Sequence, residues 1–428
     1  MKKLLALVAA GTLLAGCGLN LPGVQTNTTK FGAKRVLPKG AKKWTIMVHL
    51  AADNNLYSFG LEDMNEMEAG INSDDVNVIV LFDGTKQGDS AVYEIKHDAN
   101  GKNSTLVSVP NTDVPFIPAS HEINSGDPSV LKAFGEWAVQ KYPAEHYMVS
   151  VWDHGSGIFR RGTYNSTEFF YKGFGWDDNG SHMNTSDLST IVPAMARAAG
   201  QPIDIVGFDA CLMGHVELAY QLKGAANYLV ASEELEPGPG WDYMNWLKNV
   251  TASSTPVQAA AALVKSYGDS YKAGGSQNTS GRATDYTLSA TDINALTGSL
   301  VPAMNNFSSV LTGSLGTDKA AISSARASTQ SFYNRDCADL GHFVTQLLAS
   351  NASSGVKGAA QDVQAALAKT VVAETHTGKV SESVTNAQGL VVYFPGANQS
   401  YNAKYDDPKA IAFANESWKD FLKAFLKK

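Results

Sequence analysis

Cysteine is scarce in this sequence: the 428 residues contain three, at positions 17, 211 and 337. Proteins held together by disulfides are rich in cysteine, so this scarcity argues against a disulfide framework and favours a reactive thiol. A disulfide between Cys211 and Cys337 is the alternative. Positive charge is not in excess either, because 34 Lys and Arg face 41 Asp and Glu, for a net charge of −7. That balance argues against a nucleic-acid partner and weakly favours basic partners.

The N-terminus has the pattern of a targeting signal and is not expected to join the fold. Two lysines precede an apolar run at residues 4–14, which is too short for a transmembrane helix. The next residues, LAGC, resemble a bacterial lipoprotein cleavage site, which implies that residues 1–17 are a signal peptide ending at a lipidated Cys17. An ordinary secretory signal is the alternative. Residues 18–42, rich in Gly, Asn, Thr and Pro, are predicted to be a flexible tether.

The central stretch of the chain is an apolar run at residues 203–208 (IDIVGF), which has the composition of a buried parallel strand. Asp209 and Cys211 follow it, and apolar residues at helical spacing begin at Val216. The sulfur of Cys211 is therefore predicted to lie near a helix N-terminus at the carboxyl edge of a parallel sheet, where ligands and catalytic groups collect. The partial positive charge of that helix end would favour the thiolate.

A second apolar run, at residues 146–152 (HYMVSVW), ends in Asp153, His154 and Gly155. If both runs are parallel strands of one sheet, His154 and Cys211 meet at the same edge, with enough chain between them for a helical crossover. The glycine lets the backbone turn sharply there. The pattern predicts a thiol and imidazole pair, with a buried structural cysteine and a structural histidine as the alternatives.

Strands and helices alternate through residues 43–254, which predicts an α/β fold with a doubly wound, mostly parallel sheet. The composition, 44% hydrophobic and 18% charged, is that of a globular protein with ample core. Residues 255–385 carry Ala, Ser, Leu and Val at helical spacing and are predicted to form a mainly helical subdomain. It would be inserted before residues 386–428, the last core strand and a C-terminal helix.

Asp209 is a candidate for binding substrate. Residues two apart on a strand face the same side, so Asp209 and Cys211 should face one region. A carboxylate there raises the pKa of a thiol, which is unhelpful for a nucleophile, but it would receive a cationic substrate side chain. Helix capping is the alternative role. Asp242, in the sequence ELEPGPGWDY, is a weaker second candidate for the same pocket.

The polar, glycine-rich stretch at residues 159–186 has the character of an exposed loop beside the predicted site. It contains three basic residues, Arg160, Arg161 and Lys172. The segment at residues 177–180 (DDNG) resembles part of a calcium loop but lacks its spaced ligands and closing glutamate, so a turn is favoured and no metal site is predicted.

Five strings spread over residues 44–395 resemble the clostripain family of cysteine peptidases, which has a caspase-like fold: WTIMVHLAADNNL, VSVWDHGSG, GFDACLMGHVELAY, ASEELEPGPGWDY and GLVVYFP. The resemblance implies a catalytic dyad of Cys211 and His154, an oxyanion hole made by the backbone N–H groups of Gly155 and Cys211, and cleavage after Arg or Lys. Calcium dependence is allowed by the resemblance alone. Some members cut themselves, which makes Lys172, and then Arg160 and Arg161, candidate self-cleavage positions.

The combined prediction is an exported, lipid-anchored cysteine endopeptidase acting on protein or peptide substrates that contain Arg or Lys. Its chemistry would require no metal or organic cofactor. Two alternatives stay open: a catalytically inactive surface-binding lipoprotein of the same fold, and a transpeptidase or ligase that uses the same thioester.

Overall fold

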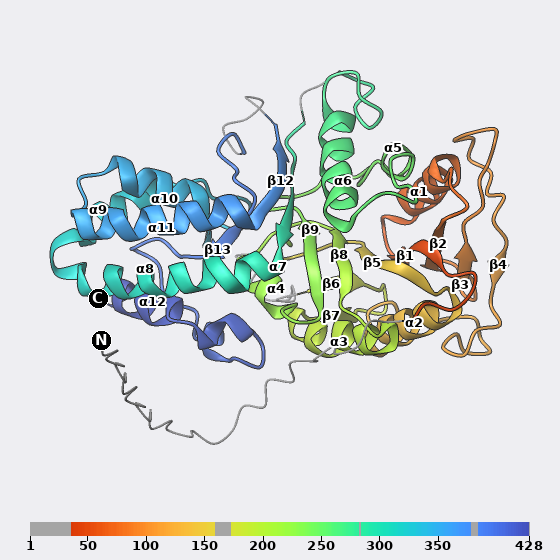
Figure 1. The fold of residues 1–428 in the computed structure, drawn as a ribbon, viewed down its shortest axis with the longest axis horizontal. Helices are drawn as coiled ribbons and strands as arrows, with labels where there is room; N and C mark the ends of the chain where they lie inside the picture. Colours follow the sequence, from red (N-terminus) through yellow and green to blue (C-terminus); the bar gives the residue numbers. More distant parts are fainter. Residues whose placement is uncertain (1–35, 159–172, 282–283, 378–383, 428) are drawn as a thin grey trace, which may run out of the picture.

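A nine-stranded sheet forms the centre of the computed structural model, which describes residues 36–158, 173–281, 284–377 and 384–427 (Figure 1). The strand order is β12-β10-β9-β8-β5-β1-β2-β3-β4. The parallel strands are β9 (Ala226–Ala231), β8 (Ile203–Asp209), β5 (Ala144–Trp152), β1 (Lys42–Ala51) and β2 (Val76–Asp83). Antiparallel strands flank them: β10 (Thr287–Asp292) and β12 (Val371–His376) at one edge, β3 (Ala91–Glu94) and β4 (Pro110–Asn111) at the other. The predicted doubly wound, mostly parallel sheet is confirmed.

Helices cover both faces of this sheet because successive side chains of each strand point to opposite faces. On one face, Met47 of β1 belongs to an apolar cluster with α2 (Pro128–Lys141) and α3 (Leu188–Ala199). On the other, its neighbours Ile46 and Val48 pack in a cluster with α1 (Tyr57–Gly70), α5 (Tyr243–Leu247) and α6 (Pro256–Tyr271). Figure 1 shows the two groups of helices on opposite sides of the strands. Burial on both faces explains the continuous apolar runs in the sequence.

The predicted helical insertion lies between β10 and β12 and extends beyond the sheet (Figure 1). It consists of α7 (Ile293–Ala295), a π-helical turn η2 (Leu296–Leu300), α8 (Val301–Gly313), α9 (Leu315–Ser328), β11 (Cys337–Asp339), α10 (Leu340–Ala349) and α11 (Ser354–Thr370). The strands β10 and β12, which border the insertion, belong to the central sheet. The preceding helix α6 packs on one face of that sheet. Residues 255–385 therefore contribute to the core as well as to the helical part.

The last strand differs from its prediction as a strand of the core. β13 (Val391–Tyr393) pairs antiparallel with β11 in a separate two-stranded sheet. The N–H of Val391 also donates to the carbonyl of Gly214 at 2.9 Å, which fixes β13 beside the loop after β8. An apolar run predicts a strand, but its partner depends on contacts far along the chain. The C-terminal helix α12 (Trp418–Leu426) packs against α8, as the amphipathic pattern requires.

Short elements complete the described chain: β6 (Phe174–Trp176), β7 (His182–Met183), η1 (Thr185–Asp187), α4 (Val216–Gln221), η3 (Ala403–Asp406) and η4 (Ala412–Asn415). Within the described ranges, we find no helix with the length and apolar character needed to span a bilayer.

Candidate active site

The strands β5 and β8 are parallel neighbours that end level with each other. Trp152 pairs with Asp209 in their register, and the N–H of Asp153 donates to the carbonyl of Asp209 at 3.1 Å. His154 and Cys211 each lie two residues beyond the Trp152–Asp209 pair. The two strands therefore deliver the imidazole and the thiol to the same carboxyl edge of the sheet, where doubly wound folds place their sites.

His154 and Cys211 line the same cavity, whose volume is about 180 Å³. Asp209 is also in its lining, together with Trp152, Leu235, Glu236, Pro237 and Gly240. A larger cavity of about 510 Å³ shares His154 and Cys211 and adds Asn55, Trp176 and Tyr333. The thiol and the imidazole thus face two adjoining cavities, one small and acidic and one wider.

Residues 212–215 separate Cys211 from the helix that the spacing predicted after it. Helix α4 begins at Val216. Before it, the N–H of Leu212 donates to the carbonyl of Glu234 at 3.1 Å, and the N–H of Gly214 donates to Ser232 at 2.6 Å. These bonds hold residues 212–214 against the loop after β9, with Leu212 at a φ of +65°. Tertiary contacts therefore set the path of the chain between Cys211 and α4.

The thiol of Cys211 is partly buried and sits among hydrogen-bond donors and acids of the loop after β9. The N–H of Glu236 donates to the sulfur at 3.3 Å. Burial raises the pKa of the Cys211 thiol, and the charges of Glu234 and Asp209 raise it further, against the opposing effect of the Glu236 N–H. The free site therefore favours the neutral thiol, and a nearby base is needed to make the thiolate.

The imidazole of His154 is positioned by the end of β1. Its Nε2 lies 2.9 Å from Oδ1 of Asn55. Burial lowers the pKa of His154, so the ring is mostly neutral near pH 7 and able to accept a proton. A neutral imidazole and a neutral thiol form a general-base pair.

Gly155 lies directly against the backbone of Cys211. A β-carbon at Gly155 would come within 2.3 Å of the Cys211 carbonyl oxygen and 3.2 Å of its nitrogen, so no side chain fits. Gly155 also forms an isolated antiparallel bridge with Phe174. This packing explains the glycine and brings the backbones of the two predicted oxyanion-hole residues together.

The carboxylate of Asp209 is buried and hydrogen-bonded by the loop after β9. It accepts from the hydroxyl of Tyr243 at 2.9 Å and from the N–H of Trp241 at 3.3 Å. Burial raises the pKa of Asp209 to about 6. The carboxyl group of the adjacent Glu236 is buried too, and burial together with the charge of Asp209 raises its pKa well above the usual range. The two carboxyl groups therefore share less than two negative charges when the cavity is empty.

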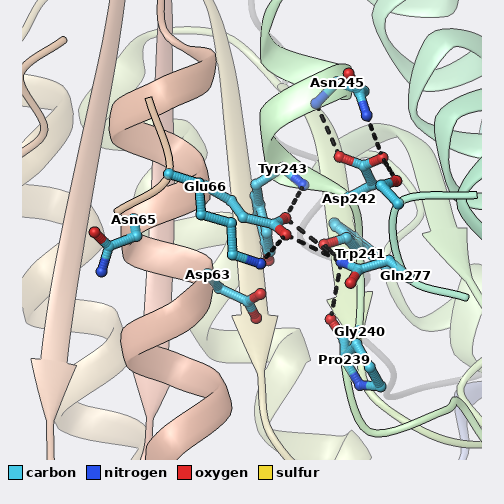
Figure 2. Close-up of polar contacts among 12 residues, drawn as sticks. Asp63, Asn65, Glu66, Pro239, Gly240, Trp241, Asp242, Tyr243, Asn245 and Gln277 are labelled. Atoms are coloured by element: carbon cyan, nitrogen blue, oxygen red, sulfur yellow. Dashed lines mark hydrogen bonds and ion pairs between the residues drawn. The ribbon is translucent and has the colours of Figure 1, made fainter. Parts of the chain in front are cut away.

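The loop after β9, which carries Glu236, is bound to α1 through the carboxylate of Glu66 (Figure 2). Glu66 accepts from the N–H of Tyr243 at 3.1 Å and from Nζ of Lys102 at 2.8 Å. The amide of Gln277 bridges from Glu66, at 3.3 Å, to the carbonyl of Pro239 at 3.4 Å. Figure 2 shows Glu66 and Gln277 meeting beside the turn before α5. These contacts fix the position of the loop after β9 beside Asp209.

Asp242 has a different place from the one predicted. Its carboxylate accepts from the N–H of Asn245 at 2.9 Å and from the amide of the same residue at 2.6 Å, so it caps the N-terminus of α5 (Figure 2). Asp242 is absent from the residues that line the two cavities. The helix-capping role considered for Asp209 thus belongs to Asp242.

Several predicted positions fall outside the described residues: Cys17, Arg160, Arg161 and Lys172. In the described residues, Cys211 and Cys337 are free thiols. The same residues contain no group of three or more His, Cys, Asp or Glu side chains arranged to hold a metal ion. Residues 177–180 form a turn, closed by the N–H of Gly180 donating to the carbonyl of Asp177 at 2.8 Å.

Three residues at the site were not singled out from the sequence: Asn55, Glu236 and Tyr243. Asn55 follows β1, which ends at the same edge as β5 and β8, so the edge rule that found His154 could also have found it. Glu236 lies on the loop after β9 and Tyr243 is the first residue of α5, and only the folded path of that loop brings them to Asp209.

The comparisons with known proteins agree with this geometry. The pattern of the Clostripain family matches residues 48–425. Clostripain from Hathewaya histolytica is 31% identical over 250 residues, which make up 52% of this chain and 44% of that protein. The matched part of this chain therefore spans less than half the length of that relative.

Two solved structures share the fold along most of the chain. A secreted C11 cysteine protease from Bacteroides thetaiotaomicron has a TM-score of 0.62 and 22% identity, over 89% of this chain and 99% of that one. An inactive zymogen C11 protease from Parabacteroides distasonis has a TM-score of 0.59 and 17% identity, over 92% and 100%. These likenesses confirm the predicted caspase-like fold. Since the family pattern runs from the first strand of the sheet to the C-terminal helix, the chain belongs to the clostripain family of cysteine peptidases.

Proposed function

We propose that the chain is an exported, lipid-anchored cysteine endopeptidase that cuts peptide bonds after Arg or Lys. One observation carries the proposal: His154, Cys211 and the buried Asp209 line a single small cavity at the carboxyl edge of the sheet. A nucleophile, a base and an anion in one cavity are the parts that such a reaction needs.

In the proposed mechanism, the thiol of Cys211 gives its proton to neutral His154 as the sulfur attacks the peptide carbonyl. The backbone N–H groups of Gly155 and Cys211 would stabilise the resulting oxyanion. His154 then gives the proton to the leaving amine, and the C–N bond breaks to leave a thioester. In the second half, His154 takes a proton from water, which attacks the thioester and releases the acid product and the thiol. These steps use no metal or organic cofactor, so activity is expected to persist in EDTA.

The proposed preference for Arg or Lys rests on the charges of the small cavity. Asp209 is buried and the carboxyl oxygens of Glu236 are enclosed in its lining, and none of the lining residues in the described chain is a lysine or arginine. The carboxyl group of Glu236 contacts the side chains of Asp209 and Trp241, and no cationic group contributes to its pKa. A guanidinium or ammonium group entering the cavity would supply donors to Glu236 and a counter-charge to Asp209.

Export and anchoring rest on the sequence of residues 1–17, which lie outside the described chain. We infer that Cys17 carries the lipid and that the residues after it tether the catalytic domain to the cell envelope. Cys17→Ala should move the protein from the membrane fraction to the soluble fraction of its host while leaving peptidase activity unchanged. Continued membrane association of the Cys17→Ala protein would contradict the lipid anchor.

The activity is tested with fluorogenic peptides that differ only at the residue before the cleaved bond: Arg, Lys, citrulline or Ala. The Arg and Lys peptides are expected to have a much higher kcat/KM than the citrulline and Ala peptides. Labelling with a peptide electrophile that ends in Lys, followed by peptide mapping, should mark Cys211. No turnover and no labelling would favour the inactive binding lipoprotein. Products joined to an added amine in place of water would indicate a transpeptidase or ligase.

A further inference from the structure

Asn55 lies in the turn between β1 and α1, four residues after the end of β1, and its side chain contacts the imidazole proposed as the base. Its Oδ1 lies 2.9 Å from Nε2 of His154. Both residues line the larger cavity beside Cys211. β1 and β5 are parallel neighbours, with Leu50 opposite Trp152 in their register, so the contact joins two strands that end at the same edge.

A second contact fixes the position of Asn55 relative to His154. The amide of Asn54 donates to Oδ1 of Asp153 at 2.8 Å and to the carbonyl of Trp176 at 3.2 Å. Oδ1 of Asn54 accepts from the N–H of Leu56 at 2.9 Å, which shapes the turn that carries Asn55. Asn54 and Asp153 are both buried. Two consecutive residues after β1 thus contact two consecutive residues after β5. Asn54 is hydrogen-bonded to Asp153, and Asn55 contacts the imidazole of His154.

We propose that Asn55 is a positioning residue for catalysis, which binds Nε2–H of His154 and so keeps Nδ1 as the nitrogen that accepts the thiol proton. A neutral imidazole carries one proton, and an acceptor at Nε2 selects the tautomer in which Nδ1 holds the free lone pair. The contact also restrains rotation of the ring. This inference rests on the proposed peptidase function and adds a third residue to the Cys211 and His154 pair.

Other ionisable groups face His154 and must stay constant in any test of its titration. Those that line the two cavities are Asp153, Asp177, Asp178, Asp209, Cys211, Glu236 and Tyr333. Asp153 is buried at the end of β5 and hydrogen-bonded to Asn54, so it orients the strand ends rather than the imidazole. Variants of Asn55 leave all of these groups unchanged.

The test compares Asn55→Ala and Asn55→Asp with the wild-type full-length enzyme on one Arg peptide. Asn55→Ala should lower kcat about 100-fold with little change in KM, because loss of orientation at a reacting group costs about that much. Asn55→Asp keeps an acceptor of the same shape and should retain most of the activity. Its added negative charge should move the acid limb of the kcat/KM profile to higher pH by stabilising the imidazolium.

Asn72→Ala is the matched control, because Asn72 is an exposed asparagine whose amide donates to the carbonyl of Lys248, away from the two cavities. It should leave kcat and the pH profile unchanged. Full activity of Asn55→Ala would overturn the proposal. Equal losses in both Asn55 variants with an unshifted acid limb would also overturn it, since a merely structural role predicts that result. An inactive wild-type enzyme would instead refute the underlying peptidase function.

Discussion

The hydroxyl of Tyr243 donates a hydrogen bond of 2.9 Å to the carboxylate of Asp209, in the lining of the cavity that holds the thiol and the imidazole. Tyr243 is on α5 and Asp209 ends β8, so the bond ties the loop after β9 to the catalytic edge of the sheet. It also leaves Asp209 with a donor when the cavity is empty. Hydrogen bonds lower the cost of burying the Asp209 carboxylate, so its side chain can keep one position before a cationic substrate binds.

Asp209→Asn tests whether this anion recognises the substrate. The change keeps the size of the side chain and an acceptor for Tyr243, but removes the charge. We expect kcat/KM for Arg peptides to fall by about two orders of magnitude, because removing one partner of a buried ion pair costs about 3–5 kcal/mol and Glu236 can still supply part of the charge. The kcat/KM for the citrulline peptide should fall much less. Equal losses on both peptides would assign Asp209 a structural role.

The pH dependence of the preference for Arg over citrulline gives a second test of Asp209. The pKa of Asp209 is raised to about 6 in the free site, so the carboxyl group becomes neutral as the pH falls through that value. The ratio of kcat/KM for Arg over citrulline should therefore be high above pH 7 and fall steeply below pH 6. Effects of Cys211 and His154 are common to both peptides and cancel in the ratio. Asp209→Asn serves as the control, because its ratio should be low and should lack the fall that the titration of Asp209 produces near pH 6.

Cys211→Ala tests the nucleophile. The variant should lose all measurable turnover while keeping the melting temperature of the wild-type protein. Its side chain is only partly buried, and the sulfur accepts a single hydrogen bond, from Glu236, so the free energy of unfolding should change by about 1 kcal/mol or less. Circular dichroism and thermal unfolding check the fold, and peptide hydrolysis checks the activity. Substantial hydrolysis by the purified variant would contradict the mechanism.

The sequence predicted the parts of this site that depend on strand direction. The runs at 146–152 and 203–208 are apolar on both faces, which indicates central parallel strands, and such strands end at one edge. That logic correctly brings His154 and Cys211 into one cavity. It also explains why Asp209, two residues before Cys211, shares the cavity. These conclusions need only the local pattern and the geometry of a parallel sheet.

The parts that the sequence did not predict depend on contacts between distant segments. Helical spacing from Val216 predicted where α4 begins, but it did not predict the hydrogen bonds that hold residues 212–214 against the loop after β9. Glu236 reaches Asp209 only through that same loop, which is fastened to Glu66 of α1. Likewise, Val391 forms a strand as expected, yet its partner is β11 and not the central sheet. Local propensity does not encode these long-range choices.

Activation by self-cleavage is the remaining prediction, and it concerns residues 159–172, which lie outside the described chain. The residues on either side of that stretch meet at the site. Gly173 donates its N–H to Oγ of Ser156 at 2.8 Å, and its carbonyl accepts from the N–H of Ser156 at 3.0 Å. Ser156 lines the larger cavity with His154 and Cys211. The Lys172–Gly173 bond therefore adjoins a residue that is held at the site.

We expect the wild-type protein to cut itself after Lys172 and to gain activity as it does so. Gly173 is buried, so cleavage at this bond requires its hydrogen bonds to Ser156 to open first, which should make activation slower than hydrolysis of a free peptide. Sequencing of new N-termini should find Gly173, whereas cleavage after Arg160 or Arg161 would give different first residues. Cys211→Ala should stay whole, and Lys172→Gln should remain both whole and weakly active. A rate independent of protein concentration would indicate that each chain cuts itself, and a fully active wild-type chain that stays intact would refute activation by cleavage.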